Sequence, residues 1–106
     1  MKQVYELHAE VCKTLANPKR IEIINLLRGG ELSVAGLLKK TGLLKANLSQ
    51  HLAVMRSKGI VLTRKEGLAV YYRIANPKIV KACDLMREVL FEQMREKGEV
   101  MKKWKR

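Results

Sequence analysis

The 106-residue chain has no apolar stretch long enough to span a membrane. Its longest apolar runs are four or five residues, whereas a membrane-spanning helix needs about 20. Charged Lys2 directly follows Met1, and no apolar signal segment comes after it. These absences indicate that no membrane is a partner, and they predict a cytoplasmic protein.

Cysteine is scarce as well, since Cys12 and Cys83 are the only two. Two cysteines do not form a disulfide framework, and thiols are normally reduced in the cytoplasm. The chain also lacks paired carboxylates, a nucleophile with a neighbouring base and a glycine-rich phosphate loop. We therefore expect a protein that is not an enzyme and that requires no cofactor.

Acidic residues are missing from the middle of the chain. The sequence holds 22 Lys and Arg against 10 Asp and Glu, a net charge of +12, yet no acid lies between Leu32 and Lys65. Such a stretch predicts a polyanionic partner, because positive charge attracts phosphate backbones. A basic face that is merely solvated is the alternative. The bases in this stretch are Lys39, Lys40, Lys45, Arg56, Lys58, Arg64 and Lys65.

The apolar content of 47% is sufficient for one small domain over residues 1–106. Apolar residues at helical spacing, with Asn-Pro pairs and glycines as start and stop signals, predict helices, and two β-rich runs predict a hairpin. In chain order the expected elements are helices over 2–15, 17–28, 33–40 and 45–58, strands over 60–64 and 68–74 around a turn at 65–67, and a helix over 77–97.

Two helices joined by a short turn and followed by a hairpin are typical of a winged helix-turn-helix. Residues 33–58 are the expected helix-turn-helix and residues 60–74 the wing, in a mainly α fold with a small β-hairpin. The second helix of the motif would lie in the major groove. Because the acid-free stretch covers the same residues, charge and motif both predict sequence-specific binding of double-stranded DNA.

The last expected helix carries two apolar strips, so it has two surfaces to pack against. One strip contains Ile79, Cys83, Met86, Leu90 and Met94, and the other contains Val80, Leu85 and Val89. A domain of this size buries a modest share of its surface, and a second copy would bury more. We therefore expect a homodimer formed by residues 2–15 and 77–97.

Several short motifs match one family of DNA-binding proteins. They are Leu15-Ala16-Asn17-Pro18-Lys19-Arg20, Glu31-Leu32-Ser33-Val34, Leu48-Ser49-Gln50-His51-Leu52, Gly59-Ile60-Val61, Arg64-Lys65-Glu66-Gly67 and Val70-Tyr71-Tyr72. With them the chain resembles, over about residues 5–92, the ArsR/SmtB family of bacterial and archaeal winged-helix repressors. The resemblance implies a homodimer built on the first and last helices. It also implies a repressor that releases its palindromic operator when a metal ion, a metalloid or a reactive sulfur species binds.

The recognition helix supplies most of the expected DNA contacts. Leu44 stands where the family usually has a serine cap, so we expect the helix start to shift by a residue or to use Thr41. Gln50 is the expected base reader, and Asn47 suits the edge of an adenine. His51 either contacts DNA or supports the helix as a half-buried, hydrogen-bonded side chain. The full expected set is Lys39, Lys40, Lys45, Ala46, Asn47, Ser49, Gln50, His51, Arg56, Arg64 and Lys65.

The metal sites that the family uses most are absent from this sequence. No thiol follows Glu31-Leu32, where many metal-sensing relatives carry Cys-x-Cys, and the last helix has no histidine. Cys12 and Cys83 remain as sensor candidates, and His8 lies one helical turn from Cys12. Three interpretations stay open. The cysteines pack as small apolar residues, or they form a redox or reactive-sulfur switch, or they bind a metal or metalloid ion together with His8.

Another class of protein stays open beside an inducible repressor. An RNA-binding or chromatin-like winged helix would keep the basic surface and need no inducer. It would not need the ordered polar residues Asn47, Ser49 and Gln50 at the start of the recognition helix. The basic tail, residues 102–106, is expected to be a frayed end and, second to that, a further phosphate contact.

Overall fold

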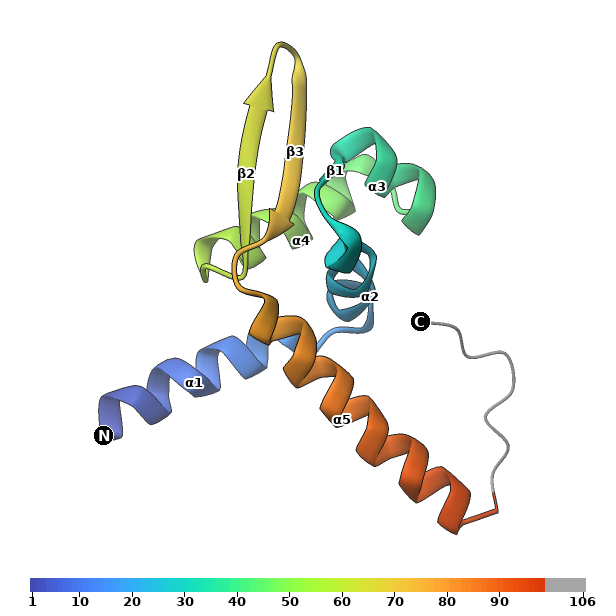
Figure 1. Cartoon of the computed structure of the whole chain (residues 1–106). Coiled ribbons are helices and arrows are strands. Elements are labelled where there is room, and N and C mark those ends of the chain that lie inside the picture. Colours follow the sequence, from blue (N-terminus) through green and yellow to red (C-terminus); the bar gives the residue numbers. More distant parts are fainter. Residues whose placement is uncertain (99–106) are drawn as a thin grey trace.

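The structure, a computed structural model, describes residues 1–98, so the basic tail at 102–106 lies outside the described residues. Figure 1 shows how the elements are arranged. They are α1 (Lys2–Leu15), α2 (Pro18–Leu26), the 3-10 turn η1 (Leu27–Gly29), β1 (Leu32–Ser33), α3 (Val34–Thr41), α4 (Lys45–Ser57), β2 (Val61–Glu66), β3 (Ala69–Ile74) and α5 (Pro77–Glu96).

Three helices begin where the sequence predicts them, because each has a side-chain cap. Asn17, Ser33 and Asn76 each accept a hydrogen bond from a backbone N–H two or three residues ahead. The second helix ends earlier than expected, since α2 stops at Leu26 and continues as the 3-10 turn that ends at Gly29.

The wing has one strand more than the sequence predicts. Strands β1, β3 and β2 form an antiparallel sheet in that order, so β3 lies in the centre. The expected turn at 65–67 is also shifted, because Glu66 pairs with Ala69 and the turn is Gly67-Leu68. Gly67 has φ +59°, which a two-residue hairpin turn requires at its first position and which glycine adopts without strain. The first strand of the hairpin therefore continues to Glu66, beyond its expected end, and the second begins at Ala69, one residue later than expected.

The core lies between α2, α3, α4 and the start of β2. Its buried side chains are Ile23, Ile24, Leu27, Leu37, Leu48, Leu52, Met55, Ile60 and Val61. The recognition helix thus turns Leu48, Leu52 and Met55 toward the core. Only its buried face is fixed by packing, and the opposite face stays available for another molecule.

Helices α1 and α5 extend away from this core on the side opposite the wing tip (Figure 1). Val11 and Leu15 of α1 and the first turns of α5 pack against it. Met86 and Leu90 share an apolar strip with Ile79 and Cys83, which pack against the core, but the structure leaves them 64% and 47% exposed. The other large apolar residues exposed on the two helices are Val4, Tyr5, Leu7, Leu85 and Val89. Among residues 1–98, no helix is both long and apolar enough to span a membrane.

Candidate nucleic-acid interface

The recognition helix α4 begins at Lys45 without a side-chain cap. Leu44 occupies the capping position and its side chain accepts no hydrogen bond, yet the helix start does not shift. Thr41 does not cap α4 either. Its hydroxyl donates to the carbonyl oxygen of Leu37 at 2.7 Å and accepts from the N–H of Leu43 at 3.3 Å, so it shapes the turn.

The first turns of α4 present a continuous polar face. Leu48 and Leu52 are buried, and the helical period places the intervening residues on the outside. Lys39 and Lys40 are exposed in the last turn of the preceding helix α3. The exposed residues expected to contact DNA on α4 are Lys45, Ala46, Asn47, Ser49, Gln50 and Arg56.

The wing and the recognition helix border the same open hollow, which has a volume of about 460 Å³. Lys45 and Ser49 line it from α4, and Leu68 and Tyr72 line it from the wing. The hollow therefore places the start of the recognition helix and the tip of the hairpin on one face of the molecule. A single duplex could contact both.

Arg64 is the one expected wing contact that is held by acidic residues. Its guanidinium pairs with Glu31 and with Glu66, the latter at 2.6 Å, and lies 4.6 Å from the ring centre of Tyr71. The hydrogen bond from Arg64 lowers the pKa of Glu31, and the bonds to Glu31 and Glu66 raise the pKa of Arg64. Both wing bases are exposed, but the charge of Arg64 is already balanced by these carboxylates, whereas Lys65 makes no salt bridge within residues 1–98.

His51 is half-buried and hydrogen-bonded, which is the supporting arrangement considered in the sequence analysis. Its Nδ1 accepts from Nε of Arg20 at 3.0 Å. Burial, and then the charge of Arg20, lower the pKa of His51, so the ring is neutral at pH 7. Arg20 and Glu31 were not among the expected site residues. Both lie in motifs that match the family, but the sequence does not show their partners, because His51 and Arg64 are distant from them in the chain.

The three sensor candidates lie in different surroundings. His8 and Cys12 are exposed on α1, whereas Cys83 is half-buried against the core. Burial is the main cause that raises the pKa of the Cys83 thiol. Within residues 1–98, no three His, Cys, Asp or Glu side chains are grouped to hold a metal ion. One protomer therefore does not gather His8, Cys12 and Cys83 into a metal site.

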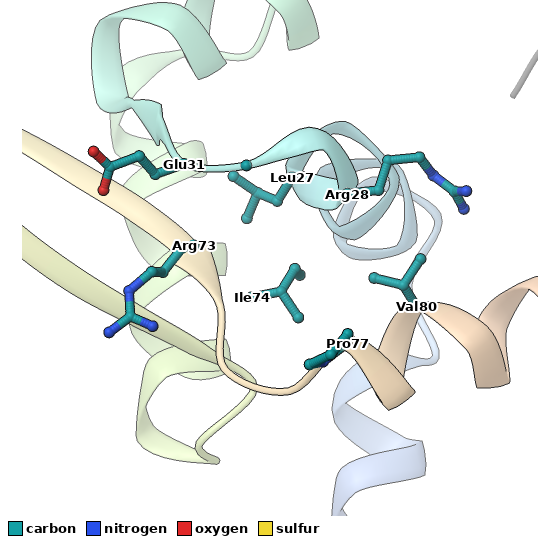
Figure 2. A pocket seen from close by; sticks show the side chains of 8 residues that line it. Leu27, Arg28, Glu31, Arg73, Ile74, Pro77 and Val80 are labelled. Atoms are coloured by element: carbon teal, nitrogen blue, oxygen red, sulfur yellow. The ribbon is translucent and has the colours of Figure 1, made fainter.

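A hollow of about 360 Å³ lies between the end of β3 and the start of α5. Figure 2 shows the apolar side chains of Leu27, Ile74 and Val80 around it. The charged ends of Arg28 and Arg73 point away from it in the same view, and Arg28 pairs with Asp84. The hollow lacks the converging polar groups that orient a bound small molecule.

Comparison with known proteins identifies the family. Residues 17–63 match the family described as bacterial regulatory protein, arsR family. The chain is 41% identical over 99 residues to the HTH-type transcriptional regulator Rv0081 of Mycobacterium tuberculosis. The aligned region covers 92% of this chain and 87% of that protein. The chain belongs to the arsR family. The resemblance seen in the sequence motifs is thereby confirmed.

Solved structures of arsR-family and related regulators have the same fold. The crystal structure of Mycobacterium tuberculosis Rv0081 has a TM-score of 0.81 at 42% identity, over 89% of this chain and 95% of that one. A homodimeric winged helix-turn-helix DNA-binding domain from Mycobacterium bovis has a TM-score of 0.78 at 34% identity, over 86% and 84% of the two chains. The winged helix-turn-helix fold is confirmed, and the protein is a DNA-binding transcriptional regulator and not an enzyme.

The two wing bases should contribute unequally to DNA binding. Lys65→Ala should reduce the slope of log affinity against log salt by about one per protomer, because within residues 1–98 Lys65 has no salt bridge and can displace a counterion. Arg64→Ala should reduce it by less, because two carboxylates already neutralise Arg64. Fluorescence anisotropy at several salt concentrations measures both slopes. Equal reductions of the slope by the two variants would contradict the unequal roles of Arg64 and Lys65.

Proposed function

We propose that this arsR-family regulator is a homodimeric repressor that binds a palindromic operator. The observation that carries the proposal is a division of the surface. The polar and basic face of α3, α4 and the wing lies at one end, and the unpartnered apolar faces of α1 and α5 lie at the other (Figure 1). A group of neighbouring exposed apolar side chains, such as those on α1 and α5, marks a protein interface.

The dimer would cover an apolar groove beside α5. This groove, of about 700 Å³, is lined by Pro18, Ile21 and Leu26 around α2 and by Leu90 of α5. The exposed apolar residues of the partner's α1 and α5 have the chemistry to fill it. A two-fold dimer buries the same patch on both copies, and the Mycobacterium bovis relative is itself described as homodimeric.

Two copies of α4 would read two half-sites of one operator. A two-fold dimer places its recognition helices in successive major grooves, so the preferred duplex repeats its half-site as a palindrome. With a net charge of +12 per chain, binding should weaken steeply as salt rises. The family is described as bacterial, and bacterial DNA lies in the cytoplasm, which is the location that we propose.

The repressor assignment has support from a further relative. The chain is 35% identical over 82 residues to the transcriptional repressor PagR of Bacillus anthracis, covering 76% of this chain and 82% of that protein. We propose that the inducing signal belongs to the reactive-sulfur, metalloid or metal class and acts on Cys12 and Cys83. Cys12 is exposed in the single chain and lies on α1, so a reaction at this thiol would act on the proposed dimer surface. Cys83 is half-buried against the core. The alternative is therefore that the cysteines are packing residues and sense nothing.

The dimer assignment predicts the effect of a charge on α5. Wild type should sediment as a dimer at micromolar concentration. Val89→Glu should raise the dissociation constant on the order of 100-fold, because each interface would bury unpaired carboxylates. Arg95→Gln lowers the net charge by the same amount at an exposed position of α5 away from this apolar strip, and it is the control for net charge. A stable wild-type monomer at this concentration would reject the dimer.

The recognition-helix assignment predicts two kinds of variant. Gln50→Ala and Asn47→Ala should each lower discrimination between operator and random duplex by about 1–3 kcal/mol per lost bidentate contact. Lys45→Ala should instead weaken binding to both duplexes alike, because it contacts phosphate. Titration against an operator selected from a random duplex library measures both. If wild type does not discriminate, or prefers RNA, the RNA-binding or chromatin-like function applies.

The sensor assignment predicts loss of response without either thiol. Operator binding by wild type should fall on treatment with at least one of polysulfide, peroxide, arsenite and zinc, and Cys12→Ser and Cys83→Ser should abolish that change. A coupling of about 1–3 kcal/mol is typical of such a switch. His8→Ala separates a metal site, which would lose its response, from a sulfur bridge, which would not. If wild type ignores every reagent, or both variants respond normally, the cysteines only pack.

A further inference from the structure

The side chain of Arg20 joins three helices. Its Nε donates to Nδ1 of His51 on α4 at 3.0 Å, and its Nη1 donates to the carbonyl oxygen of Thr14 on α1 at 3.1 Å. The backbone N–H of Arg20 is itself held at the start of α2 by Oδ1 of Asn17, at 3.2 Å. One residue of α2 therefore connects the end of α1 to the recognition helix.

The contact with α1 satisfies a group that the helix cannot satisfy. The carbonyl of Thr14 lies in the last turn of α1, where carbonyls have no partner within the helix. The adjacent carbonyls of Lys13 and Leu15 accept hydrogen bonds from backbone N–H groups beyond the helix. Arg20 supplies the bond to Thr14 and places its positive charge at the negative end of the helix dipole.

The contact with α4 depends on the protonation state of His51. Nδ1 can accept a hydrogen bond only while it carries no proton, so the neutral ring has its proton on Nε2. Burial, and then the charge of Arg20, lower the pKa of His51 and keep this form dominant at pH 7. With a proton on Nδ1, two N–H donors would face each other, and the positive imidazolium of His51 would repel the guanidinium of Arg20. Acidification therefore breaks the bond to Arg20.

Other charged groups lie close to this link. A hollow of about 350 Å³ beside Arg20 is also lined by Glu10 and Lys13 of α1 and by Lys58 at the end of α4. Glu10 and Lys58 pair at 3.2 Å, which is a second connection between α1 and α4. Both side chains of that pair are exposed, so the pair contributes little on its own. The links made by Arg20 are partly buried and stronger.

We propose that Arg20 is a positioning residue that couples α1 to the recognition helix, and that protonation of His51 uncouples them and weakens operator binding. Since α1 belongs to the surface assigned to the dimer, the link carries the geometry of the dimer to the base-reading helix. This inference rests on the proposed reading of an operator by α4. Its sign is distinctive, because a proton added for charge alone would strengthen binding to DNA.

The first test is the operator affinity of wild type between pH 7.5 and pH 5.5 at constant ionic strength. We expect the affinity to fall several-fold on acidification and by less than about tenfold at pH 5.5, because the lowered pKa of His51 leaves part of the rings neutral there. Circular dichroism at both pH values checks that the protein stays folded. Nitrogen NMR of the imidazole should show the tautomer with its proton on Nε2 at pH 7.5.

Variants of the two partners separate positioning from charge. His51→Asn places an acceptor oxygen on Cγ, where Nδ1 lies, without a titrating group, so it should keep the bond to Arg20 at pH 7.5 and lose no affinity on acidification. His51→Ala should bind about tenfold more weakly at pH 7.5 and not weaken further. Arg20→Lys keeps the charge but replaces the planar fork, so it should be equally weak, and the double variant no weaker than either single one.

Lys19→Gln is the matched control. It removes a charge next to Arg20 on α2, from a side chain that pairs with Glu22 at 3.2 Å, and it should keep the wild-type pH profile. Wild-type affinity that rises on acidification, or a His51→Ala profile equal to that of wild type, would overturn the coupling. Failure of wild type to bind any selected operator at pH 7.5 would instead reject the proposed function.

Discussion

The burial of α2 is the constraint on which the other helices depend. Ile23, Ile24 and Leu27, in α2 and the turn that continues it, are each at most 2% exposed, and α1, α3, α4 and α5 all contact α2. Full burial of one such side chain contributes about 1.5–3 kcal/mol, and three together approach the whole net stability of a small domain. The recognition helix and the two interface helices therefore share one neighbour, and a displacement of α2 would move all of them.

The helices could be predicted because their caps act on neighbouring residues. Features that depend on residues distant in the sequence could not be predicted. The caps at Asn17, Ser33 and Asn76 act on residues two or three positions ahead, so the sequence shows both partners at once. Strand β1 has two residues and exists because it pairs with β3 much later in the chain. Two residues are too few to show an alternating pattern, so the third strand of the wing could not be predicted.

The same distinction applies to the DNA-binding face. The exposed side of α4 follows from helical periodicity alone. Of the two carboxylate partners of Arg64, Glu31 is distant in the sequence and lies directly before the unpredicted strand β1. The two interpretations of His51 could not be separated in the sequence either, because Arg20 lies 31 residues away. An apolar strip likewise does not show what covers it, because Cys83 packs against the core while Met86, on the same strip, is exposed.

The missing cap at Leu44 has a consequence for the thermodynamics of DNA binding. A helix without a capping side chain loses about 0.5–2 kcal/mol and leaves its first N–H groups to water. A phosphate oxygen of bound DNA can accept the same hydrogen bonds, because the start of a helix favours an anion. The first turn of α4 is already formed without DNA, because the N–H of Leu48 donates to the carbonyl oxygen of Leu44 at 3.0 Å. A phosphate at this helix start would therefore gain hydrogen bonds without first having to order the helix.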